Sequence, residues 1–340
     1  MWLPTMGRVL TPPEDFHEDL LVSVLAHEWG VVAEAVEYRA VGFGSHHWEV
    51  GDGGGGRWFA TLDELETRRA AMDEPLDAAY ERLRAALGTA CELRGHGHSF
   101  AVAPLPTHEG EPLARVKDRF GIALYPFVTS ESFDYGEFAT EEHRRAALDL
   151  VIAVHGVPPE ERRRAMEDDF AIPHRDELEL VTRAPESVRD LGPYARATAM
   201  LLGENAQAVT RLLGRYDGLV RAARARPRVL THGEPHAGNT MRTAAGWVLI
   251  DWDTALVAPP ERDLWSLDPG DGSALAAYEA ATGVAPDPET LGMYRLRWDL
   301  ADIASFVNRF RRPHAGTPDD DKSWDFLCSL IADLGDQGGP

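Results

Sequence analysis

Apolar residues recur at two different spacings near the start of the chain, and each spacing predicts a different element. Over residues 14–30 they recur at helical spacing and the run ends in glycine, which predicts an amphipathic helix. Three strand-like runs follow, at 36–44, 47–50 and 57–62. The glycine run at 51–56 separates the last two strands and lacks the Lys-Ser/Thr of a phosphate-binding loop, so it predicts a hairpin loop.

Further along, the pattern changes from mixed to mainly helical. A helix broken near Pro75 is expected over 63–95, and strands joined by a turn are expected at 112–116 and 121–128. From about residue 138 the chain is mostly helical. The later elements are helical stretches at 186–225 and 291–310 and strand-rich patches at 228–241 and 246–257.

This order of elements predicts two lobes of an α+β fold. Residues 1–125 are expected to form a small lobe with an antiparallel sheet, and residues 126–340 a larger, mainly helical lobe. The join is expected at about 123–128.

The composition is that of a globular protein with a buried core. The chain has 340 residues, of which 44% are hydrophobic, enough for one large or two moderate domains. It has no apolar run of about 18 residues and no charged-then-apolar leader, so we expect neither a transmembrane helix nor a signal peptide. Cys91 and Cys328 are expected to be reduced, and the expected location is the cytoplasm.

The charge is strongly acidic, with a formal net charge of −22. Nucleic acids and anionic membranes bind cationic surfaces, so neither is expected as a partner. A cationic small molecule would suit this charge, although a solubilising acidic surface is the simpler explanation of the charge taken alone. The basic residues are nearly all arginine, because Lys117 and Lys322 are the only lysines.

The segment THGEPHAGN, at 231–239, places an acid and an amide five positions apart, Glu234 and Asn239. A hydroxyl that attacks a terminal phosphate needs a carboxylate to orient it and take its proton, and it needs oxygen ligands that hold Mg²⁺ against the phosphates. Glu234 meets the first need and the Asn239 amide oxygen meets the second.

A further carboxylate ligand is expected at the end of VLIDWD. Asp251 and Asp253 alternate along a strand end and should point to opposite sides, so we assign only Asp251 to the metal. Strands at about 228–231 and 247–250 are expected to pair and to bring Asn239 and Asp251 together.

The two histidines of the loop, His232 and His236, have an alternative explanation as a zinc pair, since H-x-x-x-H is a known zinc spacing. That spacing brings the two rings together on a helix, whereas Gly233, Pro235 and Gly238 prevent a regular helix here. Buried, hydrogen-bonded histidines are therefore expected.

Taken together, these motifs resemble the aminoglycoside phosphotransferase family, which has a protein-kinase-like fold. THGEPHAGN is similar to its His-Gly-Asp-x-His-x-x-Asn loop and LIDWD to its metal-binding segment. The resemblance is closest to the spectinomycin phosphotransferase branch. Three segments carry that closer resemblance, at 250–267, 123–128 and 294–303.

The resemblance implies roles for individual residues. Glu234 stands at the position of the catalytic base, and Asn239 and Asp251 at the positions of the Mg²⁺ ligands. The co-substrate would be ATP or GTP. The implied nucleotide-binding residues are Gly42, Gly44, Ser45 and Thr61, with Tyr125, Phe127 and Val128 in a hinge whose backbone holds the adenine edge. The implied supporting residues are His232, His236, Asp253 and Asp263, of which Asp263 braces the catalytic loop.

The sequence departs from the family pattern at two positions. Glu234 replaces an aspartate, and the extra methylene moves the carboxylate by about one C–C bond length. Thr61 stands where the third strand of the family carries a lysine that touches the α- and β-phosphates. Arg39 and Arg57 are the nearby cations that could replace that lysine.

The acceptor is expected to bind to the helical lobe. Asp299 and Asp302 are three residues apart and share a helix face, where they could pair with ammonium groups, and Trp298 could stack on a sugar ring. An ordinary solvated helix face and a core aromatic explain the same residues equally well.

The expected activity is transfer of the γ-phosphate of ATP or GTP to a hydroxyl of an aminoglycoside, aminocyclitol or related antibiotic. The acceptor is expected to be a cationic or polyhydroxylated small molecule, and the protein a monomer or homodimer. Two alternatives remain. One is a metabolic kinase of choline, homoserine or a sugar; the other is a catalytically impaired binding protein, because Thr61 replaces the lysine.

Overall fold

The structure is a computed structural model that describes residues 12–13, 15–41, 44–187, 189 and 191–336. Its internal contacts divide the chain into two compact units. The first unit comprises Met1–Arg68, Pro75–Asp168 and Pro227–Pro286, and the second comprises Arg69–Glu74, Asp169–Arg226 and Asp287–Pro340. The first unit thus combines the N-terminal sheet with later segments of the chain, whereas the lobes predicted from sequence divide at residue 125.

A five-stranded antiparallel sheet forms the N-terminal part of the first unit, in the order β1-β2-β3-β5-β4. Its strands are β1 (Ala35–Tyr38), β2 (Ser45–Gly51), β3 (Arg57–Glu64), β4 (Ala114–Val116) and β5 (Phe120–Pro126). The predicted hairpin is confirmed: β2 pairs with β3, and Asp52 caps the loop by accepting hydrogen bonds from the backbone N–H groups of Gly54 and Gly56.

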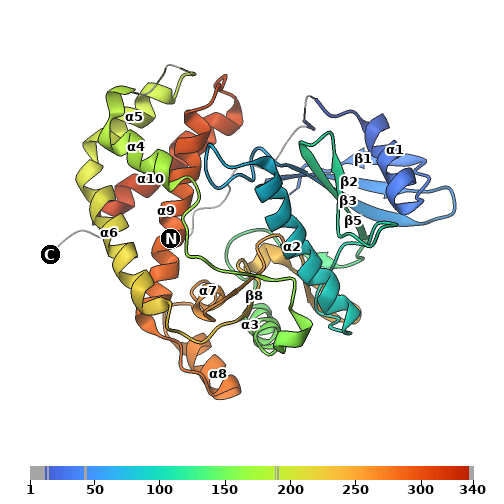
Figure 1. Cartoon of the computed structure of the whole chain (residues 1–340). Coiled ribbons are helices and arrows are strands. Elements are labelled where there is room, and N and C mark those ends of the chain that lie inside the picture. The colour runs from blue at the N-terminus through green and yellow to red at the C-terminus, as the bar shows by residue number, and fades with distance from the viewer. Residues whose placement is uncertain (1–11, 14, 42–43, 188, 190, 337–340) are drawn as a thin grey trace. The chain divides into compact units, whose positions relative to one another are not determined.

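Each face of this sheet packs against one helix (Figure 1). Helix α1 (Glu18–Trp29) buries Leu21 and Leu25 against one face, in a core that includes Trp48 and Leu62. Helix α2 (Leu76–Gly95) packs against the other, where Leu83 and Leu87 meet Leu113 and Ala123. On β3, Thr61 and Asp63 alternate with Leu62, so they lie on the α2 side.

The helix predicted over 63–95 is wrong in its first third. Strand β3 continues to Glu64, turns follow, and α2 begins only after Pro75. Proline holds its own φ near −62° and favours extended backbone before it, so the helix can start after this residue but cannot run through it.

The rest of the first unit surrounds two three-stranded sheets, β10-β9-β6 and β7-β11-β8. The strands are β6 (Glu131–Ser132), β7 (Met166–Glu167), β8 (Val229–Thr231), β9 (Thr240–Thr243), β10 (Gly246–Leu249) and β11 (Leu256–Ala258). The helices are α3 (Glu141–His155), α7 (Glu261–Leu264) and α8 (Ser273–Thr282), with 3₁₀ turns η1 (Pro159–Glu161) and η3 (Ala237–Asn239).

The predicted pairing of 228–231 with 247–250 is wrong. Strand β10 pairs with β9 across a tight turn at Thr243 and Gly246, and β8 pairs with β11 instead. A turn this short closes with little loss of chain entropy, so the local hairpin forms in preference to the longer-range pairing.

The second unit is helical. It contains α4 (Arg175–Arg183), the 3₁₀ turn η2 (Pro185–Ser187), α5 (Ala195–Glu204), α6 (Ala206–Ala223), α9 (Pro288–Phe310) and α10 (Pro318–Asp336). Helix α9 is its centre, since it packs against α4, α6 and α10 and buries residues along its whole length (Figure 1).

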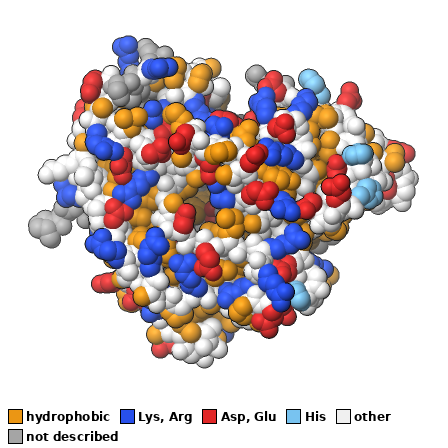
Figure 2. Space-filling model, in the orientation of Figure 1, with side chains coloured by type: hydrophobic (Ala, Val, Ile, Leu, Met, Phe, Trp, Pro, Cys, Tyr) orange, Lys and Arg blue, Asp and Glu red, His pale blue; other side chains and the backbone are white. Residues whose placement is uncertain are grey.

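Two expectations from the composition concern membrane-spanning helices and the cysteines. Among the described residues, no helix is long and apolar enough to cross a membrane. Cys91 and Cys328 are free thiols. On the face drawn in Figure 2, acidic and basic side chains are interspersed, so the negative charge does not gather there into one continuous patch.

Candidate functional site

The loop that carries Glu234 begins where β8 ends and closes with the 3₁₀ turn η3. Gly233 has a φ of +100°, and a Cβ atom placed on it would lie 2.5 Å from the Arg262 guanidinium. Arg262 in turn bonds to Thr231 Oγ1 and to the Thr254 carbonyl, both at 2.8 Å. Only glycine fits this turn, so the residue before Glu234 is determined by local geometry.

Asp263 anchors the backbone at the start of this loop. Its two carboxylate oxygens accept hydrogen bonds from the backbone N–H groups of His232 and Gly233, at 2.8 and 2.6 Å. His155 Nε2 lies 3.1 Å from the same carboxylate. Burial opposes ionisation of Asp263, but His155 and Arg262 outweigh it and lower its pKa. Asp263 is thus a buried anion bonded to the loop backbone, the position that its predicted bracing role requires.

Both loop histidines are neutral; His232 is fully buried and His236 is partly buried. Burial lowers the pKa of His232, and burial together with His232 lowers the pKa of His236 to about 4. His232 Nε2 donates to the Ile250 carbonyl at 2.9 Å, and its Nδ1 accepts from the Glu234 N–H at 3.3 Å. His236 Nε2 lies 3.2 Å from Asn239 Nδ2. These contacts favour supporting roles over a zinc pair.

Asn239 is oriented by the loop itself. Its Nδ2 donates to the Glu234 carbonyl at 2.9 Å, which directs Oδ1 away from the loop backbone. The Asn239 carbonyl accepts a hydrogen bond from the Ile250 N–H at 3.0 Å. This bond brings Asn239 beside the residue that precedes Asp251, although the predicted strand pairing is absent.

Asp251 adopts an unusual backbone conformation, with a φ of +63° that non-glycine residues seldom take. The prediction that Asp251 and Asp253 point to opposite sides is wrong, because each carboxylate lies near enough to Arg68 to raise its pKa, and Asp253 lies near enough to Asp251 to raise the pKa of Asp251. Strand β10 has already ended at Leu249, so strand alternation does not apply, and the left-handed residue redirects the chain.

Glu234, Asp251 and Asp253 form a group of carboxylates that we call the acid cluster. Burial, Asp253 and Glu234 raise the pKa of Asp251 well above its usual value, and Arg68 only partly opposes them. Burial and Asp253 raise the pKa of Glu234 to about 7, against Arg262 and Arg68. The carboxylates destabilise one another's charge, so the acid cluster has a deficit of positive charge.

The donors at the acid cluster fit Mg²⁺ bound partly by a nucleotide. Among the described residues, no three His, Cys, Asp or Glu side chains are placed to hold a metal ion alone. Mg²⁺ is commonly held by one or two carboxylates together with substrate phosphates and water. The Asp251 carboxylate and the Asn239 amide oxygen are donors of the type that such a Mg²⁺ would require.

Arg68 is the residue at this site that the sequence did not indicate. It follows β3, and its guanidinium bonds to Asp63 Oδ1 through Nε at 3.0 Å, to Ser45 Oγ at 2.9 Å and to Asp253 Oδ2 at 2.5 Å. Its position in a predicted helix gave no signal of these contacts. It favours the charged form of Asp251 and, together with Arg262, that of Glu234.

The two arginines suggested as substitutes for the missing lysine are engaged elsewhere. Arg39 and Arg57 both pair with Glu49 on β2. The Arg57 guanidinium also lies over the Phe127 ring, 3.7 Å from its centroid. Thr61 lies opposite His47 and Ala123 in the sheet, on the same face as Asp63.

Of the residues expected to cover the phosphates, Gly42 lies outside the described residues. Gly44 has a φ of +80°, and a Cβ atom there would lie 3.9 Å from Arg68 Nη2. Ser45 Oγ donates to Asp63 Oδ1 at 2.7 Å. The start of β2 therefore lies directly against Arg68.

The hinge region differs in part from the expectation. The Phe127 N–H donates to the Arg57 carbonyl at 3.3 Å, so this group completes the sheet and is not available to an adenine edge. The Tyr125 side chain, for which no role was expected, lies near Asp251, Asp63 and Asp253. Burial and these acids raise its pKa well above the usual value.

The expected acceptor residues lie on α9 in the second unit. Burial and Asp333 of α10 raise the pKa of Asp299 to about 6, with Arg295 partly opposing them. Asp299 is therefore close to another helix and is not on a fully solvated face. Trp298 and Asp302 share the helix with it, and no contact described in the structure assigns them to a ligand.

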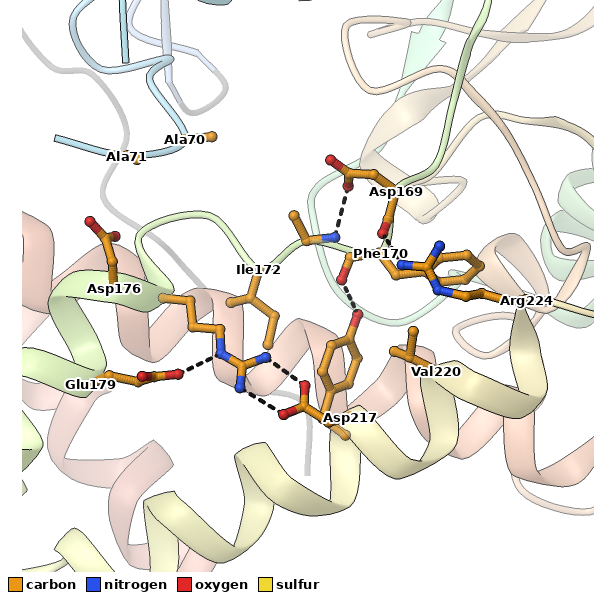
Figure 3. Close-up of a pocket in the computed structure, with 13 residues that line it drawn as sticks. Ala70, Ala71, Asp169, Phe170, Ile172, Asp176, Glu179, Asp217, Val220 and Arg224 are labelled. Atoms are coloured by element: carbon orange, nitrogen blue, oxygen red, sulfur yellow. Dashed lines mark hydrogen bonds and ion pairs between the residues drawn. The ribbon is translucent and has the colours of Figure 1, made fainter. Parts of the chain in front are cut away.

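A pocket of about 600 Å³ lies within the second unit, and we call it the Arg175 pocket (Figure 3). Its charged lining consists of Asp169, Asp176, Glu179 and Asp217, with Arg175 and Arg224. Arg175 bonds to both Asp217 oxygens, at 2.6 and 2.8 Å, and to Glu179 at 2.7 Å (Figure 3). None of Trp298, Asp299 and Asp302 lines it.

Residues 36–320 match the phosphotransferase enzyme family. Protein StrN of Streptomyces griseus is 34% identical over 252 residues, which cover 69% of this chain and 72% of StrN. Spectinomycin phosphotransferase APH(9)-Ia, solved with ADP and spectinomycin, aligns with a TM-score of 0.67 and 17% identity over 93% of this chain and 97% of that one. For choline kinase LicA from Streptococcus pneumoniae the TM-score is 0.55, at 13% identity over 93% and 99%. The structural likeness confirms the predicted α+β, protein-kinase-like fold.

Proposed function

Because the chain belongs to the phosphotransferase enzyme family, we propose that it transfers the γ-phosphate of ATP or GTP to a hydroxyl group of a small molecule. Family membership supports the reaction class and confirms the resemblance inferred from the THGEPHAGN and LIDWD segments. The acceptor, the nucleotide and the role of each residue are part of the proposal.

The observation that carries the proposal is the acid cluster. A carboxylate whose pKa is about 7 can take a proton near neutral pH, and Glu234 has such a pKa because burial and Asp253 oppose its charge. An ordinary surface glutamate is a much weaker base. The raised pKa therefore supports Glu234 as the group that orients and deprotonates the acceptor hydroxyl.

In the reaction, the acceptor oxygen attacks the γ-phosphorus while the bond from that phosphorus to the β,γ-bridging oxygen breaks. The hydroxyl proton passes to Glu234, and the nucleoside diphosphate leaves with the bridging oxygen. The Asn239 amide oxygen and the Asp251 carboxylate would hold Mg²⁺, which when bound neutralises charge on the phosphates.

The glutamate in place of aspartate fits this role. The Glu234 N–H donates to His232, and the Glu234 carbonyl accepts from Asn239, so the backbone on which the longer side chain is built is held at both ends. The extra methylene thus extends from a backbone that is held in place. The acceptor hydroxyl can shift to reach the displaced carboxylate more easily than a set of metal ligands could.

We propose an aminoglycoside, an aminocyclitol or a related antibiotic as the acceptor. The net charge of −22 supports a cationic acceptor. The fold is shared with kinases of spectinomycin and of amicoumacin, but it is also shared with a choline kinase. A metabolic alcohol kinase is therefore the second candidate, with the same chemistry and a different pocket.

Mass spectrometry of candidate acceptors tests the proposal. Each acceptor is incubated with the protein, Mg²⁺, and ATP or GTP, and its mass is compared with that from an Asp251→Ala control. The expected result is an added phosphate on at least one aminocyclitol antibiotic, with the wild-type protein only. Phosphate gain on choline or a sugar alone would favour the metabolic kinase. Nucleotide binding without transfer to any acceptor would indicate the impaired binding protein.

A further inference from the structure

The nucleotide-facing side of the five-stranded sheet lacks a cation where the family carries its lysine. Thr61 occupies that position, and the nearest histidine in register with it, His47, is neutral because burial lowers its pKa to about 4. Arg39 and Arg57 are held by Glu49. A nucleoside triphosphate carries several negative charges, so a phosphate site without a protein cation would depend on Mg²⁺ and backbone amides alone.

Arg68 lies at the meeting point of the elements that surround such a site. Its guanidinium contacts the start of β2 at Ser45, the end of β3 at Asp63 and the segment after β10 at Asp253. Asp253 is 185 positions away in the sequence, so this contact exists only in the folded chain. Gly44, directly before β2, lies next to the same group, since a Cβ atom there would be 3.9 Å from Arg68 Nη2.

The guanidinium is anchored but not saturated. Arginine has five N–H donors. Nε uses one on Asp63, Nη2 uses two on Asp63 and Ser45, and Nη1 uses one on Asp253. Within the part of the chain that the structure describes, the second Nη1 hydrogen has no acceptor. An anchored guanidinium with an open donor is suited to a phosphate oxygen, because little side-chain entropy is lost on binding.

We propose that Arg68 supplies the positive charge for the nucleotide phosphates that the strand position Thr61 lacks, with Asp63 as the anchor that orients it. This inference rests on the proposed function, since it requires a nucleotide in the site. Arg68 would thus contact the phosphates in place of the family's strand lysine, from a position seven residues after Thr61. Asp253 links it to the acid cluster.

A purely structural bridge between β3 and the segment after β10 is the competing explanation of these contacts. The phosphate-binding role and the structural bridge predict a different dependence of binding affinity on the number of phosphates in the ligand. A phosphate-binding arginine matters for ATP and ADP and hardly for adenosine, whereas a bridge that only holds the fold affects all nucleotides alike.

Isothermal titration calorimetry with ATP, ADP and adenosine, in the presence of Mg²⁺, separates these explanations. Arg68→Met is expected to weaken ATP and ADP binding by about 10- to 100-fold and to change adenosine binding less than about twofold. Adding Thr61→Lys to Arg68→Met is expected to recover about tenfold of the ATP affinity, because it restores a cation on the same face. Arg84→Met is the matched control, because it removes an arginine of α2 that is paired with Glu111.

Thermal unfolding of each variant is measured alongside. If Arg68→Met does not fold, Arg68→Gln takes its place, because it keeps hydrogen-bonding capacity without the charge. Equal losses for ATP and adenosine, or no loss for ATP, would overturn the role of Arg68 while leaving the proposed function standing. Failure of the wild-type protein to bind ATP or GTP would overturn the proposed function, and this inference with it.

Discussion

The acid cluster of the first unit and the Arg175 pocket of the second unit both gather carboxylates, but they balance the charge differently. In the Arg175 pocket, hydrogen bonds from Arg175 lower the pKa of Asp217, and Asp217 in turn raises the pKa of Arg175. In the acid cluster, burial and the neighbouring carboxylates raise the pKa of Glu234 and Asp251, and Arg68, joined by Arg262 at Glu234, only partly opposes them.

The difference separates two uses of clustered charge. A cluster whose charges are paired stabilises itself and needs no ligand. A cluster whose carboxylates are only partly compensated lowers folding stability, and such an arrangement is typical of sites that bind a cation or move a proton. Backbone strain does not distinguish the two regions, since Asp251 and the pocket residue Phe170 both have a positive φ, of 63° and 64°.

The largest effect is expected at the metal position. Asp251→Ala should reduce phosphate transfer by about a thousandfold, because charge on the phosphates is no longer balanced, while the fold is retained. Steady-state kinetics with the best acceptor and circular dichroism measure the two quantities. Substantial residual turnover in a folded variant would remove Asp251 from the metal site.

Glu234→Gln should lower kcat by about 10²- to 10⁴-fold, the usual contribution of a general base. The amide keeps the shape of the side chain and loses the proton acceptor. The Michaelis constant for the nucleotide should stay near its wild-type value, since the proposed role of Glu234 concerns the acceptor. A variant with wild-type kcat would show that the proton goes elsewhere.

The wild-type rate should depend on pH through Glu234. Its pKa is raised to about 7, so the base is protonated and inactive below that pH, and kcat should rise as pH increases through about 7 to a plateau. The rising limb should be absent from the remaining activity of Glu234→Gln. An unchanged limb in that variant would assign the titration to another group.

How far the site could be predicted depended on how local its determinants are. The helix within 14–30 and the glycine-run hairpin are determined by neighbouring residues, and both predictions are confirmed. The acid–amide spacing of Glu234 and Asn239 is equally local, and the roles assigned to these residues stay predictions. The family resemblance and the kinase-like fold followed from them. The orientation of Asp253 was not foreseen, because it depends on the backbone of one residue, Asp251.

Arg68 was missed for a different reason. Its role depends on Ser45, 23 positions before it, and on Asp253, 185 positions after it. A stretch with helix-forming composition gave no indication that the strand continues to Glu64 and then turns. Contacts of this range arise from the packing of separate elements and leave no periodic pattern in the sequence.

Stability should respond in opposite directions in the two regions. The folded-state pKa of Glu234 is raised from 4.5 to about 7, so its contribution to stability is fully present below pH 4.5 and is lost as pH rises through 7. Glu234→Gln removes that loss and should raise the free energy of unfolding at pH 8 by about 2 kcal/mol. Thermal unfolding of the wild type and the variant at pH 5 and pH 8 measures this. An equal change in the free energy of unfolding at both pH values would contradict the prediction.

The smallest effect is expected in the Arg175 pocket. Arg175→Met should lower the free energy of unfolding by about 1 kcal/mol, because Asp217 and Glu179 lose a partner that is partly exposed to solvent. Nucleotide affinity should not change. Arg183→Met is the matched control, since Arg183 pairs with the same Glu179 from a mostly exposed position and should be nearly neutral. A tenfold loss of nucleotide affinity in Arg175→Met would end the contrast between the two regions.

Electron paramagnetic resonance of Mn²⁺, used in place of Mg²⁺, tests the acid cluster most directly, because it needs no knowledge of the acceptor. The wild-type protein is titrated with Mn²⁺ in the presence and absence of ADP, beside Asp251→Ala and the control Arg183→Met. Phosphate transfer at this site predicts that ADP tightens Mn²⁺ binding in the wild type and in Arg183→Met, and that Asp251→Ala weakens the ternary complex about 100-fold. Mn²⁺ and ADP binding to Asp251→Ala as tightly as to the wild type would contradict the assignment of the acid cluster as the catalytic centre.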